Sequence, residues 1–193
     1  KAKLKIIEFA KDVGGREDLE WLAVRLGQGT NSEAKQTWAA MMKIFSGVEI
    51  DVLNTWESRL ISNESIYHLS ASQEIDFLKI VLSKTPDKEK PKYYEQIASR
   101  SFTTGQYEQA ANYYNLLYTS NLTAADKDRI LPKYLDSCLR CQNEKAVTLV
   151  MEYLSNNVFN AEHPIIKIID DYFADTKVGA DKNNVLKALK GIT

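Results

Sequence analysis

The feature that most constrains the fold is an apolar pattern with helical spacing that occurs twice, 32 residues apart. Residues 2–15 and 34–47 align at this offset. The aligned positions are Ala2, Ile6, Phe9, Ala10, Val13 and Gly15 in the first segment, and Ala34, Trp38, Met41, Met42, Phe45 and Gly47 in the second. These steps of one, three or four residues place apolar side chains on one face of an α-helix, and glycine is common just beyond a helix end. We therefore expect two helices that bury these faces.

Each of these helices leads into another amphipathic segment. Residues 16–26 carry an apolar stripe of Leu19, Leu22, Ala23 and Leu26, and residues 48–61 carry one of Leu53, Trp56 and Leu60. Thr30 and Glu33 have the spacing of a capping box at the start of the helix between them. The section therefore predicts helix, turn, helix, turn, with a period near 32 residues.

Residues 1–61 resemble HEAT-type repeats, with a second helix followed by a complete helix pair. Lys35 stands where that family often has arginine, whereas the proline and aspartate frequent in HEAT helices are missing. The resemblance implies stacked helix pairs and a first helix without its partner. Because the chain begins with Lys1 rather than Met, we expect it to be a piece of a longer protein whose array extends N-terminally.

The segment KTPDKEKPK, residues 84–92, is the predicted boundary between two sections because it combines two prolines with a run of charges. Before it, Ser70 and Gln73 have capping spacing ahead of a helix near residues 74–83. The expected domains are residues 1–84 and residues 91–193. They form either two domains or one continuous solenoid.

Residues 93–119 predict a helix pair with Gly105 in its turn. With GQYEQA at residues 105–110, this pair resembles a tetratricopeptide repeat, which implies that Ala110 lies where two helices approach closely and that Tyr114 packs on the next repeat. A second unit at residues 130–154, with Ala146 in place of Ala110 and Pro132 in its first turns, extends the resemblance to about residues 91–157. A helix from Pro164 and a polar amphipathic helix near the C-terminus are expected to cap the array.

These patterns together predict an all-α fold, a right-handed α-α superhelix of about 10–11 helices in antiparallel pairs. In tetratricopeptide proteins the first helices of the pairs line a concave binding surface. The resemblance places five residues there as the predicted partner-binding residues: Lys92, Glu95, Ser99, Phe102 and Thr103.

The second unit contributes Asp128, Leu131, Leu135, Cys138 and Leu139 to the same inner face. This face is largely apolar, so either the last helices cover it or it receives a hydrophobic partner segment, and we favour covering. Chaperone-binding members of the family hold a C-terminal carboxylate with a Lys/Asn/Arg clamp. Glu95, Ser99 and Leu135 stand where the clamp is needed, so we expect no such binding.

Composition and motifs argue against several functions. Lys and Arg total 25 against 26 Asp and Glu, so no basic excess favours nucleic acid, and no apolar run reaches the length of a membrane-spanning helix. The two histidines, His68 and His163, are far apart, and the cysteines of CLRC, Cys138 and Cys141, are expected to be small apolar fillers. We therefore predict no catalytic residue, no cofactor and no metal site.

The sequence favours a non-catalytic module for protein–protein interaction or scaffolding, with a protein or peptide partner. One alternative is an accessory helical domain of an enzyme whose catalytic part lies N-terminal to this chain. Another is a sensor of a peptide or small molecule, with a pocket between the two repeat sections. Reduced cysteines and the lack of a signal peptide favour the cytoplasm.

Overall fold

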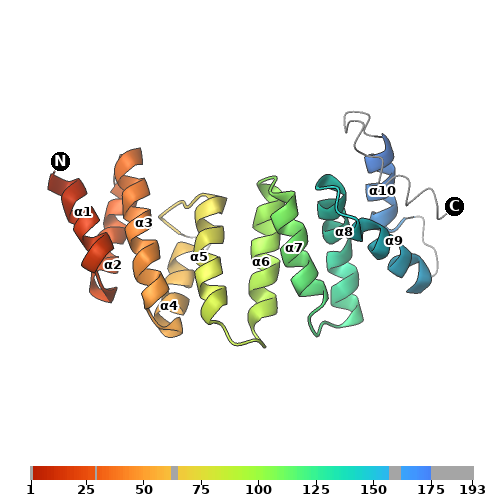
Figure 1. Ribbon diagram of the computed structural model, residues 1–193, viewed down its shortest axis with the longest axis horizontal. Coiled ribbons are helices and arrows are strands. Elements are labelled where there is room, and N and C mark those ends of the chain that lie inside the picture. Colours follow the sequence, from red (N-terminus) through yellow and green to blue (C-terminus); the bar gives the residue numbers. More distant parts are fainter. Residues whose placement is uncertain (1, 29, 62–64, 157–161, 175–193) are drawn as a thin grey trace. The chain divides into compact units, whose positions relative to one another are not determined.

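A computed structural model describes residues 2–28, 30–61, 65–156 and 162–174 of the chain. These residues form ten α-helices and one short 3-10 helix, and no strand occurs among them, so the predicted all-α fold is confirmed (Figure 1). The chain divides into two compact units, residues 1–93 and 94–193. The superhelical course of the helices and its handedness stay predictions, as do the two domains.

The described part of the first unit contains five complete α-helices, one 3-10 helix and the start of a sixth α-helix. They are α1 (Ala2–Val13), η1 (Arg16–Asp18), α2 (Leu19–Gln28), α3 (Asn31–Gly47), α4 (Ile50–Leu60), α5 (Ala71–Lys84) and α6 (Lys90–Thr103), with α6 continuing into the second unit. Helix α3 packs against α1, α2 and α5, and α4 packs against α5.

Polar side chains fix where two of these helices begin. Thr30 Oγ1 accepts a hydrogen bond from the Glu33 backbone N–H at 3.3 Å, and Glu33 Oε2 accepts one from the Thr30 backbone N–H at 3.0 Å. Ser70 and Gln73 repeat the arrangement at the start of α5, at 3.3 and 2.9 Å. Each pair satisfies N–H groups that a helix N-terminus leaves without a partner, so both predicted capping boxes are confirmed.

The core of the first unit centres on Phe45 of α3. Its ring meets Trp56 of α4 at 5.8 Å and Phe77 of α5 at 5.0 Å between centroids, both in edge-to-face geometry. The stripes predicted for residues 16–26 and 48–61 are buried throughout: Leu19, Leu22, Ala23, Leu26, Leu53, Trp56 and Leu60. Helical spacing alone therefore identified the core faces of α2 and α4.

The face predicted for α1 is wrong at three positions and right at Ala10. Ile6, Phe9 and Val13 are 53%, 69% and 64% exposed, whereas Ile7 and Ala10 are buried. The alignment matched α1 to α3, which packs against three helices and buries a wide arc of its surface. In the described part of the chain, α1 packs mainly on α3, so a narrower arc one residue away from Ile6 is buried.

The second unit completes α6 and adds α7 (Tyr107–Tyr118), α8 (Ala124–Arg140), α9 (Lys145–Asn156) and α10 (Pro164–Ala174). Helix α8 packs against α7, α9 and α10. Ala110 and Tyr114 of α7 are buried, with 0% and 1% of their surface exposed, and the Tyr114 ring lies 6.4 Å from that of Tyr134 on α8. The expected burial of Ala110 and the expected packing of Tyr114 on the following helix pair are therefore confirmed.

Helix α8 begins earlier than the sequence suggested. Thr123 Oγ1 accepts a hydrogen bond from the Asp126 backbone N–H at 3.1 Å and caps a helix that starts at Ala124, not at Ile130. Pro132 therefore lies inside the helix rather than in its first turns. Because proline has no N–H, the Asp128 carbonyl lacks its usual intrahelical donor.

The apolar face of α8 is covered. Leu131, Leu135, Cys138 and Leu139 are all buried, and α10 packs on α8. Ile165 of α10 is fully buried in the same cluster. Covering by a C-terminal helix was the favoured alternative; the second predicted capping helix, near the C-terminus, lies outside the described residues.

The turns that close α6 and α8 have the same geometry. Gly105 has φ of 75°, and the next N–H, of Gln106, donates to the Ser101 carbonyl at 2.8 Å. Gln142 has φ of 55°, and Asn143 N–H donates to the Cys138 carbonyl, also at 2.8 Å. Both are Schellman-type helix ends, which favour glycine at the residue of positive φ. Glycine occupies this position only after α6. The turn after α8 forms with Gln142 there instead.

Replacing Gln142 by glycine is therefore expected to stabilise the chain by about 0.5–1 kcal/mol, because glycine adopts positive φ without steric conflict. Gly105→Ala is expected to destabilise it by about 1–2 kcal/mol for the converse reason. Urea unfolding followed by circular dichroism measures both. Gly27→Ala serves as the control, because an alanine within α2 should be neutral or stabilising. A destabilised Gln142→Gly variant contradicts the argument.

Candidate functional site

The predicted partner-binding residues lie along α6, where two of them are engaged in ion pairs. Lys92, in the first unit, places Nζ 3.0 Å from Glu57 Oε1. Glu95, in the second unit, accepts hydrogen bonds from both terminal nitrogens of Arg129, at 2.5 and 3.0 Å. Their charges are thus balanced within the chain.

The other three residues of this set have intramolecular contacts as well. Ser99 lies next to the Tyr114 side chain, whose pKa burial raises. The Phe102 ring packs edge-on against Tyr107 at 5.6 Å, and the Thr103 hydroxyl donates to the Arg100 carbonyl at 2.9 Å. Thr103 is exposed and Phe102 is partly exposed. Their role in binding a partner stays a prediction.

The ion pair of Glu95 gives a pH-dependent contribution to stability. The hydrogen bonds from Arg129, followed by its charge, hold the pKa of Glu95 below its ordinary value. A lowered folded-state pKa stabilises the fold above the unfolded pKa, and this contribution is lost as the pH falls through the folded pKa. Arg129→Gln is therefore expected to unfold at lower urea than the parent at pH 7, with the difference vanishing toward pH 2.5. A difference that persists unchanged in acid contradicts this origin.

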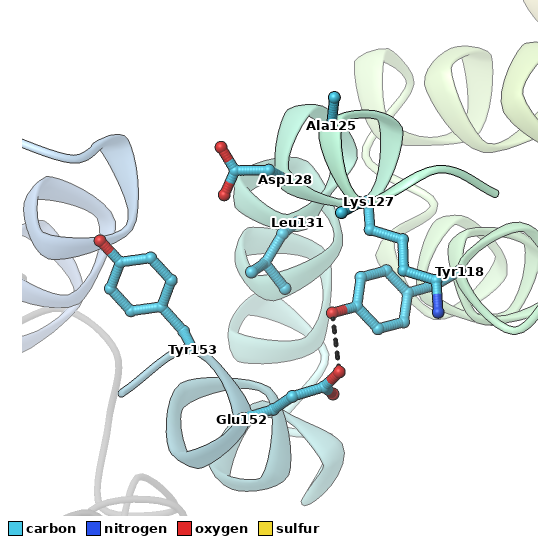
Figure 2. A pocket seen from close by; sticks show the side chains of 8 residues that line it. Tyr118, Ala125, Lys127, Asp128, Leu131, Glu152 and Tyr153 are labelled. Atoms are coloured by element: carbon cyan, nitrogen blue, oxygen red, sulfur yellow. Dashed lines mark hydrogen bonds between the residues drawn. The ribbon is translucent and has the colours of Figure 1, made fainter. Parts of the chain in front are cut away.

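A pocket of about 460 Å³ lies in the second unit, where the end of α7, the first turns of α8 and the middle of α9 meet (Figure 2). The lining consists of Tyr118, Ala124, Ala125, Lys127, Asp128, Leu131, Glu152 and Tyr153. The cap at Thr123 starts α8 early enough to bring Ala125 and Asp128 to the mouth of the pocket.

One wall is built from residues of three helices. Tyr118, the last residue of α7, donates its hydroxyl to Glu152 Oε1 of α9 at 3.1 Å, and Lys127 Nζ of α8 lies 5.2 Å from the centre of the Tyr118 ring (Figure 2). Burial, followed by the charge of Glu152, raises the pKa of Tyr118 to about 12. The hydroxyl therefore stays protonated at neutral pH and holds the Glu152 carboxylate in place.

The opposite wall is held by His163, just before α10. His163 Nε2 lies 3.4 Å from Asp128 Oδ1, and its ring lies 4.6 Å from that of Tyr153. His163 Nδ1 accepts a hydrogen bond from the Ile165 backbone N–H at 3.3 Å. In neutral His163, Nε2 thus carries the proton and faces Asp128, which orients the carboxylate. The result is a cavity with Leu131 as its buried floor and two carboxylates on its walls.

A second pocket, of about 380 Å³, lies in the first unit between α1 and α3. Its polar lining residues are exposed: Lys5, Glu8, Lys11 and Gln36. By contrast, hydrogen bonds and ring contacts fix the side chains around the α7–α9 pocket, so we take that pocket as the candidate site.

Sequence reasoning found part of this site. Asp128 and Leu131 were placed on the inner face of α8, but Tyr118, Lys127 and Glu152 were not singled out. Their separation in the sequence could have indicated the contact: Tyr118 and Glu152 are 34 residues apart, as are Glu95 and Arg129. This distance is close to one helix pair, so residues on neighbouring pairs meet.

The lining contains no serine, threonine, cysteine or histidine that could act as a nucleophile or metal ligand. Among the described residues, no group of three or more His, Cys, Asp or Glu side chains is placed to hold a metal ion. Within the same residues, no helix is long and apolar enough to cross a bilayer. The lining offers an apolar floor, two carboxylates, one ammonium group and two tyrosine side chains.

The two cysteines are free thiols at the C-terminal end of α8 and are not part of the pocket lining. Burial raises the pKa of Cys138 to about 12, and burial also raises the pKa of Cys141. Since the thiolate is the reactive form, we expect iodoacetamide at pH 8 to modify Cys141 slowly and Cys138 only after unfolding. Mass spectrometry of native and urea-treated protein measures this. Rapid modification of both thiols in the native chain contradicts it.

We compared the chain with protein-family models, curated proteins and solved structures, and none of these comparisons found a match.

Proposed function

We propose that this chain is a non-catalytic protein-binding module, built from helix pairs of the HEAT and tetratricopeptide kind, which scaffolds a partner protein. The observation on which this proposal rests is the α7–α9 pocket. Its floor is apolar and its walls carry oriented charged groups, a combination suited to one or two side chains of a partner.

Repeated contacts support the helix-pair interpretation. Arg140 and Tyr107 lie 33 residues apart and are in contact, and Tyr118–Glu152 and Glu95–Arg129 pair at 34. Helices two apart in sequence also pack on each other, α1 on α3, α3 on α5 and α8 on α10. Both patterns are expected where similar helix pairs follow one another and each packs on its neighbour.

The test is affinity capture with the intact chain as bait, using extract of the cells from which the chain comes, with captured proteins identified by mass spectrometry. Ala125→Arg fills the mouth of the pocket at an exposed position and is expected to lose the partner. Thr148→Arg adds the same side chain at an exposed position of α9 outside the pocket lining and should retain it.

The outcomes test separately whether the chain binds a partner and whether the α7–α9 pocket is the binding site. No protein retained reproducibly above an unrelated helical bait argues against the proposed function. A partner retained equally by both variants leaves a binding module but moves its site elsewhere, with the α6 residues then tested by Thr103→Arg. The accessory-domain and sensor alternatives stay predictions, since no observation on the described residues favours either.

A further inference from the structure

We propose that the α7–α9 pocket binds a positively charged side chain, arginine or lysine, that a partner segment inserts between Tyr118 and Tyr153. This inference rests on the proposed function and specifies the residue that the pocket recognises. It follows from the charges of the lining, from its shape, and from the way in which its carboxylates are held.

The charge balance of the lining favours a cation. Glu152 and Asp128 are the acidic residues of the lining, and Lys127 is its single basic residue. Lys127 Nζ lies against the Tyr118 ring, 5.2 Å from its centre, whereas Glu152 Oε1 accepts a hydrogen bond from the neutral Tyr118 hydroxyl. A neutral donor orients the carboxylate without balancing its charge. Glu152 is thus prepared to form a charge-assisted hydrogen bond with a guanidinium or ammonium group.

The shape of the pocket suits a long basic side chain. Leu131 gives a buried apolar floor, and Tyr118 and Tyr153 stand on either side of it (Figure 2). Arginine and lysine bury their methylene groups against apolar surface and keep their charged ends on polar groups. Tyrosine rings also attract cations that approach their faces. A cavity of about 460 Å³ accommodates one such side chain together with part of its neighbours.

An anionic ligand is the main alternative, because the pocket includes Ala124 and Ala125 in the first turn of α8, where a helix dipole attracts negative charge. Two observations oppose it. Asp126, in that same first turn, already places a carboxylate near the helix end and has its own N–H bonded to Thr123. An anion in the cavity would also meet Asp128 and Glu152 on the walls. We therefore keep anion binding as an outcome that overturns the proposal.

The test uses the full chain, labelled with ¹⁵N, and three blocked pentapeptides. The first is Gly-Leu-Arg-Leu-Gly, the second has citrulline in place of arginine, and the third has glutamate there. Citrulline has the shape of arginine without its charge. We expect the arginine peptide to shift the amide signals of Ala125, Asp128 and Glu152, and to bind about tenfold or more tightly than the citrulline peptide, as loss of a charge-assisted hydrogen bond predicts.

Three variants locate the effect. Glu152→Gln is expected to weaken binding of the arginine peptide by about tenfold. Lys127→Gln removes the competing positive charge and should strengthen it by about two- to threefold at low salt. Glu108→Gln changes the same charge as Glu152→Gln at an exposed position of α7 outside the lining, and should leave affinity unchanged. Glu152→Gln could lose affinity simply because it destabilises the fold. Lys127→Gln is expected to gain affinity for the arginine peptide, so it tests the proposal independently.

Equal binding of the arginine and citrulline peptides overturns the inference, and so does tighter binding of the glutamate peptide. It is also overturned if no peptide shifts the pocket signals at millimolar concentration, or if Lys127→Gln weakens binding of the arginine peptide. The inferred preference for a basic side chain can be wrong while the proposed binding function is right. A partner captured by the parent chain and lost with Ala125→Arg supports the module even when the pentapeptides show no preference for charge.

Discussion

Replacing Phe45 by alanine is expected to lower the free energy of unfolding of the first unit by about 3–5 kcal/mol. The ring is completely buried and contacts Trp56 and Phe77 edge-on, so its removal leaves a cavity among three helices and deletes two aromatic contacts. Thermal and urea unfolding, followed by tryptophan fluorescence, measure the loss, because Trp56 reports on this core directly.

Phe9→Ala is the matched control, because it removes the same ring from a position that is 69% exposed. An exposed apolar side chain on a helix contributes little, so we expect a change within about 0.5 kcal/mol. If Phe9→Ala destabilises the chain as much as Phe45→Ala, then α1 is oriented differently and the face predicted from the sequence is the buried one.

The second large effect is expected at Tyr134 of α8, which connects α7 with α8. Its ring lies 6.4 Å from that of Tyr114 and 5.8 Å from that of Tyr118, and its hydroxyl donates to Asn115 Oδ1 at 2.8 Å. Tyr134→Ala is expected to destabilise the second unit by about 3–5 kcal/mol through the cavity and the lost ring contacts. Urea unfolding followed by far-ultraviolet circular dichroism measures the effect.

Tyr134→Phe separates the two contributions, since it keeps the ring and removes only the hydroxyl. Loss of one hydrogen bond to a neutral partner predicts a change of about 0.5–1.5 kcal/mol. The two variants together therefore predict that packing outweighs the hydrogen bond by a factor of about three. A Tyr134→Phe variant as unstable as Tyr134→Ala indicates instead that the bond to Asn115 dominates.

Much of the fold followed from local patterns. The stripes of α2 and α4, the caps at Thr30 and Ser70 and the burial of Ala110 and Tyr114 depend only on residues within a few turns of one another. Helical periodicity and capping chemistry are properties of this range, and a sequence displays them directly.

The errors arose where the outcome depends on neighbours that are distant in sequence. Which side of α1 is buried depends on the number of helices that pack against it, and its apolar residues on two faces allowed either answer. The start of α8 was missed because the polar segment around Ala124 resembles a loop until Thr123 is recognised as its cap.

The candidate site was predicted only in part for the same reason. Asp128 and Leu131 lie on a helix face that periodicity reveals, but the cavity exists because Tyr118 and Glu152 come from two other helices. The residue types do not indicate this contact, because tyrosine and glutamate are common on any partly exposed helix. Only the separation of about one helix pair connects them.

The separation of about one helix pair also affects how fast each unit folds. Several polar side-chain contacts between successive helix pairs join residues 33 to 39 positions apart, from Arg140–Tyr107 to Arg59–Glu20, and ring contacts such as Phe45–Trp56 join residues that are closer still in sequence. Contact order is therefore modest, and the entropy lost in closing each loop is small. Each helix can pack on its neighbours soon after it is synthesised, so this arrangement favours rapid folding of each unit.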